Sequence, residues 1–508
     1  MEIFSNLLLG ASTAFLPMNL FYGFVGCLLG TAIGVLPGLG PTATIAMLLP
    51  ITFGLPPESA LIMLAGIFYG AQYGGSTTAI LINLPGESSS VVTAIDGYQM
   101  ARNGRAGAAL ATAALGSFFA GTVATIGLAI AGPTILLAMA APPLAAVALN
   151  FGPAEYFSLM VLGLVASVAL ASGSLPKAMA MIVLGLILGT IGTDVESGTP
   201  RYVFDIPELY DGLNFVAVSM GIFGICEILR NLEHEQKRSV GVKRVSGLML
   251  TKDDFRRVRG PVLRGTALGS FLGILPGGGA MLASFAAYAM EKRLSPNRAE
   301  FGKGAIEGVA APESANNAGA QTSFIPMLTL GIPGNPVMAL MVGAMILQGI
   351  TPGPNVISDE PDLFWGLIVS MWSGNLMLVI LNLPLIGLWV RMLTVPYHLL
   401  FPAIVGFCCI GAYSINNSVF DVFVMAGFSV VGFALSKLRF EPAPLLLGFI
   451  LGPMLEENLR RAMLISQGDP MIFLRSPLSL SLLIFAVVVL ALVLSPSISR
   501  KREEAFTE

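Results

Sequence analysis

The chain is organised around long runs of apolar residues that are separated by short polar stretches. Eight runs contain no Lys, Arg or Glu: 3–57, 59–86, 106–154, 156–176, 178–193, 265–290, 363–390 and 476–499. A helix needs about 20 predominantly apolar residues to cross a bilayer. The pattern therefore predicts a polytopic, all-α membrane protein with roughly 10 to 14 membrane segments, where breaks at Pro and Gly limit the count.

A glycine-spaced segment occurs twice. Residues 26–40 (GCLLGTAIGVLPGLG) recur as residues 265–279 (GTALGSFLGILPGGG), with eight of fifteen positions identical. Glycine at every fourth position leaves one helix face without side chains, so that another backbone can approach closely. Each copy then reaches a Pro-Gly pair that interrupts α geometry. A duplicated helix broken in this way is typical of the substrate sites of secondary transporters.

Further matches extend the repeat. Gly70-Ala-Gln72 recurs as Gly319-Ala-Gln321, and each is followed by a second Pro-Gly pair, at 85–86 and 333–334. Residues 184–189 also match residues 447–452. We therefore expect an N-terminal apolar segment at 1–22 and two transmembrane repeats at 20–193 and 262–455. Residues 194–264 would hold an extra span and a connector, and 456–508 the last span and a tail.

Charge predicts the orientation of these segments. The connector at about 230–264 carries ten Lys or Arg residues against four acids, which places it and the basic tail in the cytoplasm by the positive-inside rule. Its place between membrane spans argues against a nucleic-acid-binding patch. Arg460, Arg461 and Arg475 do not fit a simple assignment of the last turns.

Equivalent loops of the two halves have opposite charge. Residues 50–57 carry no base, whereas the matching loop of the second half has Lys292, Arg293, Arg298 and Lys303. After the second Pro-Gly pair the sense reverses, because Arg102 and Arg105 correspond to an acidic, base-free stretch at 348–363. This reversal predicts inverted repeats. Bases at both ends of 265–290 further predict a hairpin that enters from the cytoplasm, with 23–50 entering from outside; a pair of kinked through-helices is the alternative.

Polar residues gather beside the second Pro-Gly break of each half. Amides, hydroxyls and carboxylates are costly in hydrocarbon and are tolerated mainly where they line a cavity. The alternative is that the hydroxyls only bond back to helix carbonyls and hold helices together. The predicted substrate- and ion-binding residues are Pro37, Gly38, Gly40, Gln72, Ser76, Thr77, Thr78, Asn83, Pro85, Gly86, Glu87, Pro276, Gly277, Glu313, Ser314, Asn316, Asn317, Gln321, Pro333, Gly334 and Asn335.

These clusters contain no Lys or Arg. An anionic ligand would therefore be held by helix N-termini, freed backbone amides and Ser, Thr or Asn donors. Glu87 and Glu313 would hold a coupling cation, Na⁺ or H⁺, unless they are solvated caps at the membrane interface. We expect no cofactor and no enzymatic activity, because the clusters contain no His or Cys and the chain has no Walker motif. The four cysteines lie in apolar stretches, as buried thiols do.

Three motifs resemble those of a known family. Residues 34–40 (GVLPGLG), 73–87 (YGGSTTAILINLPGE) and 312–318 (PESANNA) are similar to the large membrane subunit of the tripartite tricarboxylate transporters, the TctA family. The resemblance covers nearly the whole chain. It implies a multi-pass subunit of the bacterial inner membrane that imports di- or tricarboxylates by symport. It also implies a small membrane subunit and a periplasmic solute-binding protein as partners. A permease without a binding protein, or a channel, is the alternative function.

Overall fold

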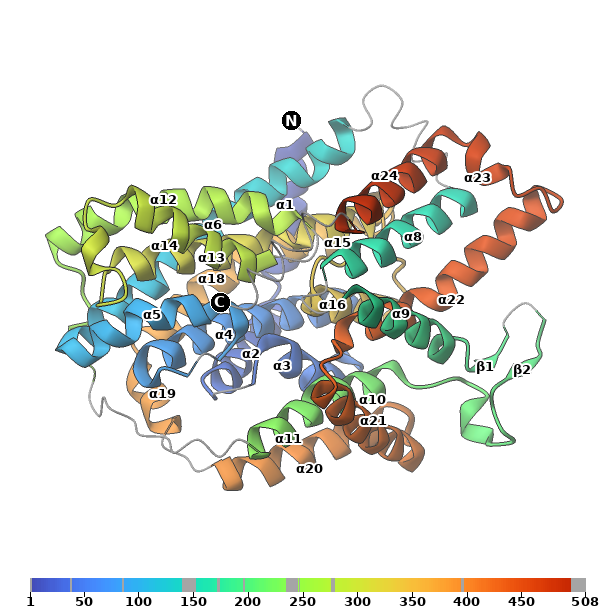
Figure 1. Ribbon diagram of the computed structural model, residues 1–508, viewed down its shortest axis with the longest axis horizontal. Helices are drawn as coiled ribbons and strands as arrows, with labels where there is room; N and C mark the ends of the chain where they lie inside the picture. The colour runs from blue at the N-terminus through green and yellow to red at the C-terminus, as the bar shows by residue number, and fades with distance from the viewer. Residues whose placement is uncertain are drawn as a thin grey trace.

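The computed structural model describes residues 2–36, 39–84, 86–138, 152–170, 174–194, 197–233, 245, 247–275, 279–393 and 397–494. Within these residues the fold is almost entirely helical, and the single sheet pairs β1 (Gly192–Thr193) with β2 (Pro200–Arg201) (Figure 1). The helices of the first half are α1 (Glu2–Ala14), α2 (Pro17–Gly34), α3 (Pro41–Leu48), η1 (Leu49–Thr52), α4 (Pro57–Ile82), η2 (Ser88–Ser90), α5 (Val91–Met100), η3 (Ala101–Arg105), α6 (Ala106–Ala138), α8 (Pro153–Leu170) and α9 (Leu175–Gly189).

The remaining helices follow the sheet. They are η4 (Pro207–Leu209), α10 (Phe215–Ser219), η5 (Met220–Ile225), α11 (Cys226–Glu233), α12 (Lys252–Ile274), α13 (Gly279–Leu294), η6 (Arg298–Glu300), α14 (Glu307–Thr322), α15 (Phe324–Leu330), α16 (Pro336–Leu347), α17 (Val356–Asp359), α18 (Pro361–Asn382), α19 (Ile386–Met392), α20 (Tyr397–Asn416), α21 (Val419–Lys437), α22 (Pro442–Ile465), α23 (Ile472–Arg475) and α24 (Pro477–Leu494).

Five helices of the described residues are long and apolar enough to cross a membrane by themselves. They cover Pro17–Gly34, Val91–Ile130, Phe215–Glu233, Pro361–Asn382 and Val419–Lys437. Seven shorter apolar helices accompany them. The all-α membrane class predicted from the sequence is thus confirmed, while the count of 10 to 14 segments stays a prediction.

The glycine stripe of the first half packs α2 against α4. A Cβ atom added at Gly26, Gly30 or Gly34 would overlap with the carbonyl oxygens of Met63, Ile67 and Ala71, respectively. Each step of four residues along α2 matches a step of four along α4. The two helices therefore run in the same direction, with their backbones in direct contact.

The second half repeats this contact between α12 and α14. A Cβ atom at Gly265 or Gly269 would overlap with the carbonyl oxygens of Ala311 and Ala315. Gly273 stands in the same relation to Gly319. The helices α12 and α14 are parallel too, and they lie side by side, with α13 packed against both (Figure 1).

Parallel partners require the chain between them to return. In the second half α13 runs back along α12, since Arg264 and Glu291, which flank the uncharged segment, form a two-point ion pair with N···O distances of 2.9 and 2.7 Å. In the first half α3 and η1 make the same return between α2 and α4. Both segments thus fold back as helical hairpins rather than as straight kinked helices. Their turns, at 37–38 and 276–278, lie outside the described residues.

The α2–α4 pair and the α12–α14 pair run in opposite directions. In the middle of α4, the ring of Tyr69 lies 6.0 Å from that of Phe324. Further along α4, Ser76 contacts Glu313, and Ile80 packs with Val309 around Gly97. As residue numbers increase along α4, the residues that they contact in α14 and α15 decrease in number, so α4 is antiparallel to these two helices.

The matched segments 184–189 and 447–452 belong to α9 and α22, which pack on each other. A Cβ atom at Gly185 would overlap with Leu445, and one at Gly189 would lie 2.7 Å from the carbonyl oxygen of Phe449. Residue numbers at the contacts increase together along α9 and α22, so the two helices are parallel. Helices related by inversion run in opposite directions, and this third sequence match is therefore a shared packing motif of small residues rather than an inverted pair.

Candidate functional site

Both second Pro-Gly breaks have the same local form. The helix before each break ends on a residue with left-handed geometry, Asn83 at φ 58° after α4 and Gly331 at φ 67° after α15. The residue after each Pro-Gly pair is extended and precedes a new helix, Glu87 before η2 and Asn335 before α16. The Asn335 side chain accepts a hydrogen bond of 2.9 Å from the amide of Met338, as an N-cap does.

Each break lies beside the second arm of the hairpin in its own half. A Cβ atom at Gly40, which precedes α3, would be 3.7 Å from the carbonyl oxygen of Gly86. A Cβ atom at Gly279, the first residue of α13, would be 3.6 Å from Nδ2 of Asn335. Hairpin and broken helix therefore meet in both halves.

Glu313 is the centre of a buried polar cluster. Its carboxylate accepts hydrogen bonds from Ser76 of α4 at 2.8 Å, from Thr93 of α5 and, at 3.4 Å, from Ser117 of α6. Asn317 lies one turn further along α14 and donates to Ser117 Oγ at 2.6 Å. Three helices of the first half thus converge on one carboxylate of the second half. Hydroxyl donors of this kind favour an ionised carboxylate in an otherwise apolar surrounding.

A second carboxylate is held between the halves. Glu87, which is 9% exposed, accepts from Asn316 Nδ2 at 2.9 Å and from Ser89 Oγ at 2.6 Å. No hydrogen bond or ion pair found among the described residues joins Glu87 or Glu313 to a Lys or Arg.

Part of the cluster borders a small cavity. Its lining comes from α4, α6, α14 and α18, namely Tyr73, Ser76, Thr77, Leu110, Ala113, Ala114, Ser117, Glu313 and Asn382. The hydroxyl of Tyr73 and Oδ1 of Asn382 are buried and find no hydrogen-bond partner within the described residues. The cavity therefore offers free oxygen atoms beside the Glu313 carboxylate.

The other predicted residues have different surroundings. Gln72, Ser314, Asn316 and Gln321 are buried, and the first three keep a side-chain oxygen without a partner in the described part of the chain. Thr78 donates to the carbonyl of Val35 at 2.7 Å and so stabilises the end of α2. Asn83 is exposed, and Pro333 and Gly334 are buried in the second break. Pro37, Gly38, Pro85, Pro276 and Gly277 lie outside the described residues.

Sequence reasoning missed four residues of these networks: Thr93, Ser117, Asn382 and Asp96. The first three are single polar residues within apolar helices, where no local pattern separates a cavity-lining side chain from one that bonds to its own helix. Only their contacts reveal the difference. Asp96 lies ten positions after Gly86. An acidic residue beside apolar membrane segments indicates a functional or paired carboxylate, so its position was a usable sequence signal.

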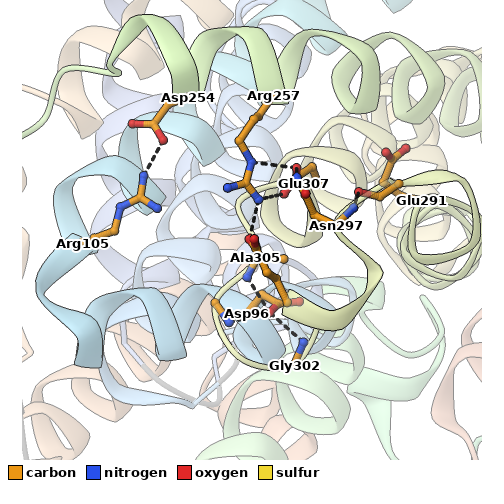
Figure 2. Close-up of polar contacts among 12 residues, drawn as sticks. Asp96, Arg105, Asp254, Arg257, Glu291, Asn297, Gly302, Ala305 and Glu307 are labelled. Atoms are coloured by element: carbon orange, nitrogen blue, oxygen red, sulfur yellow. Dashed lines mark hydrogen bonds and ion pairs between the residues drawn. The ribbon is translucent and has the colours of Figure 1, made fainter.

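Asp96 belongs to a polar network at one end of the bundle, which joins the two halves (Figure 2). It is fully buried, and its Oδ1 accepts hydrogen bonds of 2.8, 2.8 and 2.9 Å from the backbone amides of Gly302, Gly304 and Ala305. Its Oδ2 accepts from Tyr288 at 2.9 Å. One carboxylate of α5 thus holds the loop between α13 and α14.

Two arginine contacts extend this network. Arg257 binds Glu307 with N···O distances of 2.8 and 2.7 Å, and these hydrogen bonds raise the pKa of Arg257 further above its usual value. Arg105 pairs with Asp254 at the start of α12 (Figure 2). Burial alone would raise the pKa of Asp254, but hydrogen bonds from Thr251 and Arg105 together lower it below its ordinary value.

The model of the tripartite tricarboxylate transporter TctA family matches residues 20–447. This chain belongs to the TctA family. A protein of Agrobacterium vitis named "Uncharacterized 52.8 kDa protein in TAR-I ttuC' 3'region" is 65% identical over 508 residues, which cover all of this chain and 99% of that protein.

A second relative is shorter. It is named "Uncharacterized protein in TAR-II ttuC' 3'region", also from Agrobacterium vitis, and is 66% identical over 240 residues, which are 47% of this chain and 99% of that protein. No solved structure matches this chain. The family membership agrees with the resemblance in residues 34–40, 73–87 and 312–318, and it identifies the chain as a subunit of a tricarboxylate transporter system.

Proposed function

We propose that this chain imports di- or tricarboxylates, such as citrate-like organic acids, across the bacterial inner membrane by cation-coupled alternating access. The observation that carries the proposal is the contact between Ser76 and Glu313 at 2.8 Å. It joins two polar, Pro-Gly-broken segments from opposite halves inside an apolar bundle. Secondary transporters place their substrate and ion sites at such a junction.

The directions of the helices support inverted repeats. In each half a hairpin packs through a glycine stripe on a parallel partner, α2 on α4 and α12 on α14. Because α4 is antiparallel to α14, one unit corresponds to the other after inversion. Equivalent glycines 239 positions apart, Gly34 and Gly273, make equivalent contacts, which is what a duplicated and inverted unit would produce.

Contacts between loops support a placement of the base-free loops and the basic loops on opposite sides of the membrane. Gln348 donates to the carbonyl of Thr52 at 3.2 Å, so the two base-free loops lie at one end of the bundle. Arg105 and Asn103 contact Asp254 and the carbonyl of Lys303, so the basic loops lie together at the other end. The positive-inside rule assigns the basic end to the cytoplasm.

The arginines that do not fit the rule are paired with acids. Arg460 lies 2.9 Å from Asp194 and 2.6 Å from Glu456, and Arg475 lies 2.8 Å from Asp469. Arg461 pairs with Glu457 one turn away. Because the positive-inside rule counts Lys and Arg and gives acids little weight, this pairing does not assign these turns to either side of the membrane.

The carboxylate substrate would bind at the breaks rather than at basic side chains. The new helices begin beside Glu87 and Asn335, and in α16 Pro336 has no amide proton while Asn335 caps the amide of Met338. The first-turn amides that remain, together with the helix dipole, would attract an anion. Asn316, Asn317 and Gln321 add side-chain amide donors from α14, which is buried along its whole length.

The partners are proposed from the family. Tripartite systems comprise a large membrane subunit, a small membrane subunit and a solute-binding protein, and we propose the same assembly for this chain. The test is uptake of radiolabelled citrate and related acids by cells that express the chain with the small subunit and the binding protein of the same system. Uptake that requires all three supports the proposal.

Two results would change it. Uptake by this chain in the absence of a binding protein would favour an independent organic-anion permease. Absence of uptake for every di- and tricarboxylate, with all three proteins present in the cell envelope, would contradict carboxylate transport.

A further inference from the structure

The cavity beside Glu313 differs from the rest of the polar cluster in what it offers a ligand. Its polar lining consists of Tyr73, Ser76, Thr77, Ser117, Glu313 and Asn382. The polar side-chain atoms of this set are all oxygens, except for the amide nitrogen of Asn382. Nδ2 of Asn382 is already bound to the carbonyl of Leu378 at 2.9 Å, which leaves Oδ1 as the free end of the amide.

Two of these oxygens are unpartnered and deeply buried. Tyr73 and Asn382 are each 4% exposed, and neither the Tyr73 hydroxyl nor Asn382 Oδ1 has a hydrogen-bond partner in the described residues. Ser76 and Ser117 donate their protons to Glu313, so that each hydroxyl oxygen still has lone-pair capacity on its other side. Buried polar groups normally have hydrogen-bond partners, so we expect a ligand or a water molecule to contact these two oxygens.

The size and charge of the cavity restrict the ligand. The space holds roughly one water-sized occupant, which is far smaller than a di- or tricarboxylate. A carboxylate wall also repels an anion. A small hard cation suits the site, because such ions prefer carboxylate, carbonyl and hydroxyl oxygens, and a cation would neutralise a buried carboxylate that has no basic partner among the described residues.

We propose that this cavity is a Na⁺ site in which the Glu313 carboxylate supplies the charge and Asn382 of α18 supplies a neutral oxygen ligand. The proposal rests on the proposed transport function and refines it by separating the two ligands. The cation binds between α4, α6, α14 and α18, and the organic anion binds at the Pro-Gly breaks. The helix α18 lies outside the duplicated clusters, so it completes the ion site without belonging to the repeated motif.

The experiment measures Na⁺ binding without transport. The full chain, purified in detergent, is heated in NaCl, KCl or N-methylglucamine chloride at constant ionic strength. We expect Na⁺ alone to raise the melting temperature in a saturable manner. Asn382→Leu keeps the approximate volume and removes the oxygen, and it should weaken the apparent Na⁺ affinity at least tenfold. Glu313→Gln should abolish the Na⁺ effect.

The matched control is Asn375→Leu. Asn375 lies two turns earlier on α18, is fully buried, and has neither amide atom partnered in the described residues, but it does not line the cavity. This variant should keep the wild-type Na⁺ response. Size-exclusion chromatography checks folding, and Asn382→Ser provides a second, smaller oxygen ligand that should retain part of the affinity.

The outcomes separate the two proposals. Equal stabilisation by Na⁺ and K⁺ in the wild type, or an unchanged Na⁺ affinity in Asn382→Leu, overturns the Na⁺ site. Uptake of carboxylate driven by a pH gradient and indifferent to Na⁺ would also overturn it while leaving the transport function intact. Specific Na⁺ binding without any carboxylate uptake would instead contradict the transport function and leave the site standing.

Discussion

Asn316 and Glu87 are joined by a hydrogen bond of 2.9 Å between Nδ2 and Oε1. Glu87 follows the second Pro-Gly pair of the first half, and Asn316 lies in the polar run of the second half. They are 229 positions apart in the chain, yet both are buried. The contact ties the start of η2 to the middle of α14, so a change in either half is transmitted to the other at the candidate site.

Removal of amide groups from the cluster is predicted to abolish uptake. Asn317→Ala deletes the donor to Ser117, and Gln72→Ala deletes a buried amide of α4. Each unmet polar group in a dry site costs about 1–3 kcal/mol, and loss of several substrate contacts would lower affinity by orders of magnitude. The measurement is radiolabelled uptake, with membrane insertion followed by immunoblot. Wild-type uptake in both variants would reduce the cluster to a packing role.

Labelling of single cysteines is predicted to separate the two ends of the bundle. In a background without native thiols, cysteine at Gly54 or Ser358, which are both exposed, should react with an impermeant reagent from the periplasmic side. Cysteine at Arg102 or Lys292 should react only after the membrane is opened. Thr52 and Gln348, close to the first pair, are already in contact. Labelling of position 292 from outside would exclude both the inversion and the cytoplasmic entry of the α12–α13 hairpin.

Substitution in the glycine stripe is predicted to lower stability. In Gly30→Ala the new methyl group would overlap with the carbonyl oxygen of Ile67, and α2 would have to move away from α4. Overpacking of this kind costs about 1–3 kcal/mol. The control is Gly427→Ala in α21, where nothing lies within 4 Å of the added atom. Thermal unfolding in detergent should show a lower melting temperature for the first variant only.

The ion pair between Arg105 and Asp254 is predicted to make stability depend on pH. The folded protein holds the pKa of Asp254 below its ordinary value of 3.8, so its stabilising contribution is present above pH 3.8. It is lost as the pH falls through the lowered pKa. The stability difference between wild type and Asp254→Asn should therefore be largest at neutral pH and shrink below pH 3.8.

The control for this pH dependence is Asp253→Asn, because Asp253 is the exposed neighbour. Unfolding followed by fluorescence between pH 7 and pH 3 gives the comparison. A difference between wild type and Asp254→Asn that stays constant over this range would contradict the assigned role of the pair.

The carboxylate of Asp96 is predicted to be required for the order of the loop at 302–305. Asp96→Ala leaves the backbone amides of Gly302, Gly304 and Ala305 without this acceptor, and the unpaired amide of buried Ala305 alone costs about 1–3 kcal/mol. Asp96→Asn keeps one carbonyl acceptor and should be milder. Limited proteolysis should cut near Gly302 much faster in Asp96→Ala than in wild type. Equal cutting rates would show that the loop is held by other contacts.

The sequence predicts the elements of this fold better than their partners. Glycine spacing located the stripe on α2 and α12, and Pro-Gly pairs located the breaks beside Glu87 and Asn335, because both features are local. Which helix receives a stripe depends on packing across the chain, and the same small-residue motif places α9 parallel to α22. That pair was interpreted as part of the repeat, although its direction differs from inversion.

The candidate site was predicted in part for the same reason. Glu313 and Asn317 stand out because they lie in a dense polar run of an otherwise apolar chain. Ser117 and Asn382 are isolated in apolar helices, and a single hydroxyl or amide has many structural uses. Their role depends on a neighbour about 200 positions away in the case of Ser117, and on a cavity assembled from four helices in the case of Asn382.

The glycine contacts of α2 with α4 and of α12 with α14 also constrain how the protein moves. Side chains can change rotamer and let neighbouring helices slide, but these interfaces are formed by backbone against backbone and have no rotamers to exchange. Each hairpin and its partner helix should therefore travel as one stiff body. Motion during a transport cycle is then confined to the seam between the two bodies, where hydroxyl and amide contacts can be remade at small energetic cost.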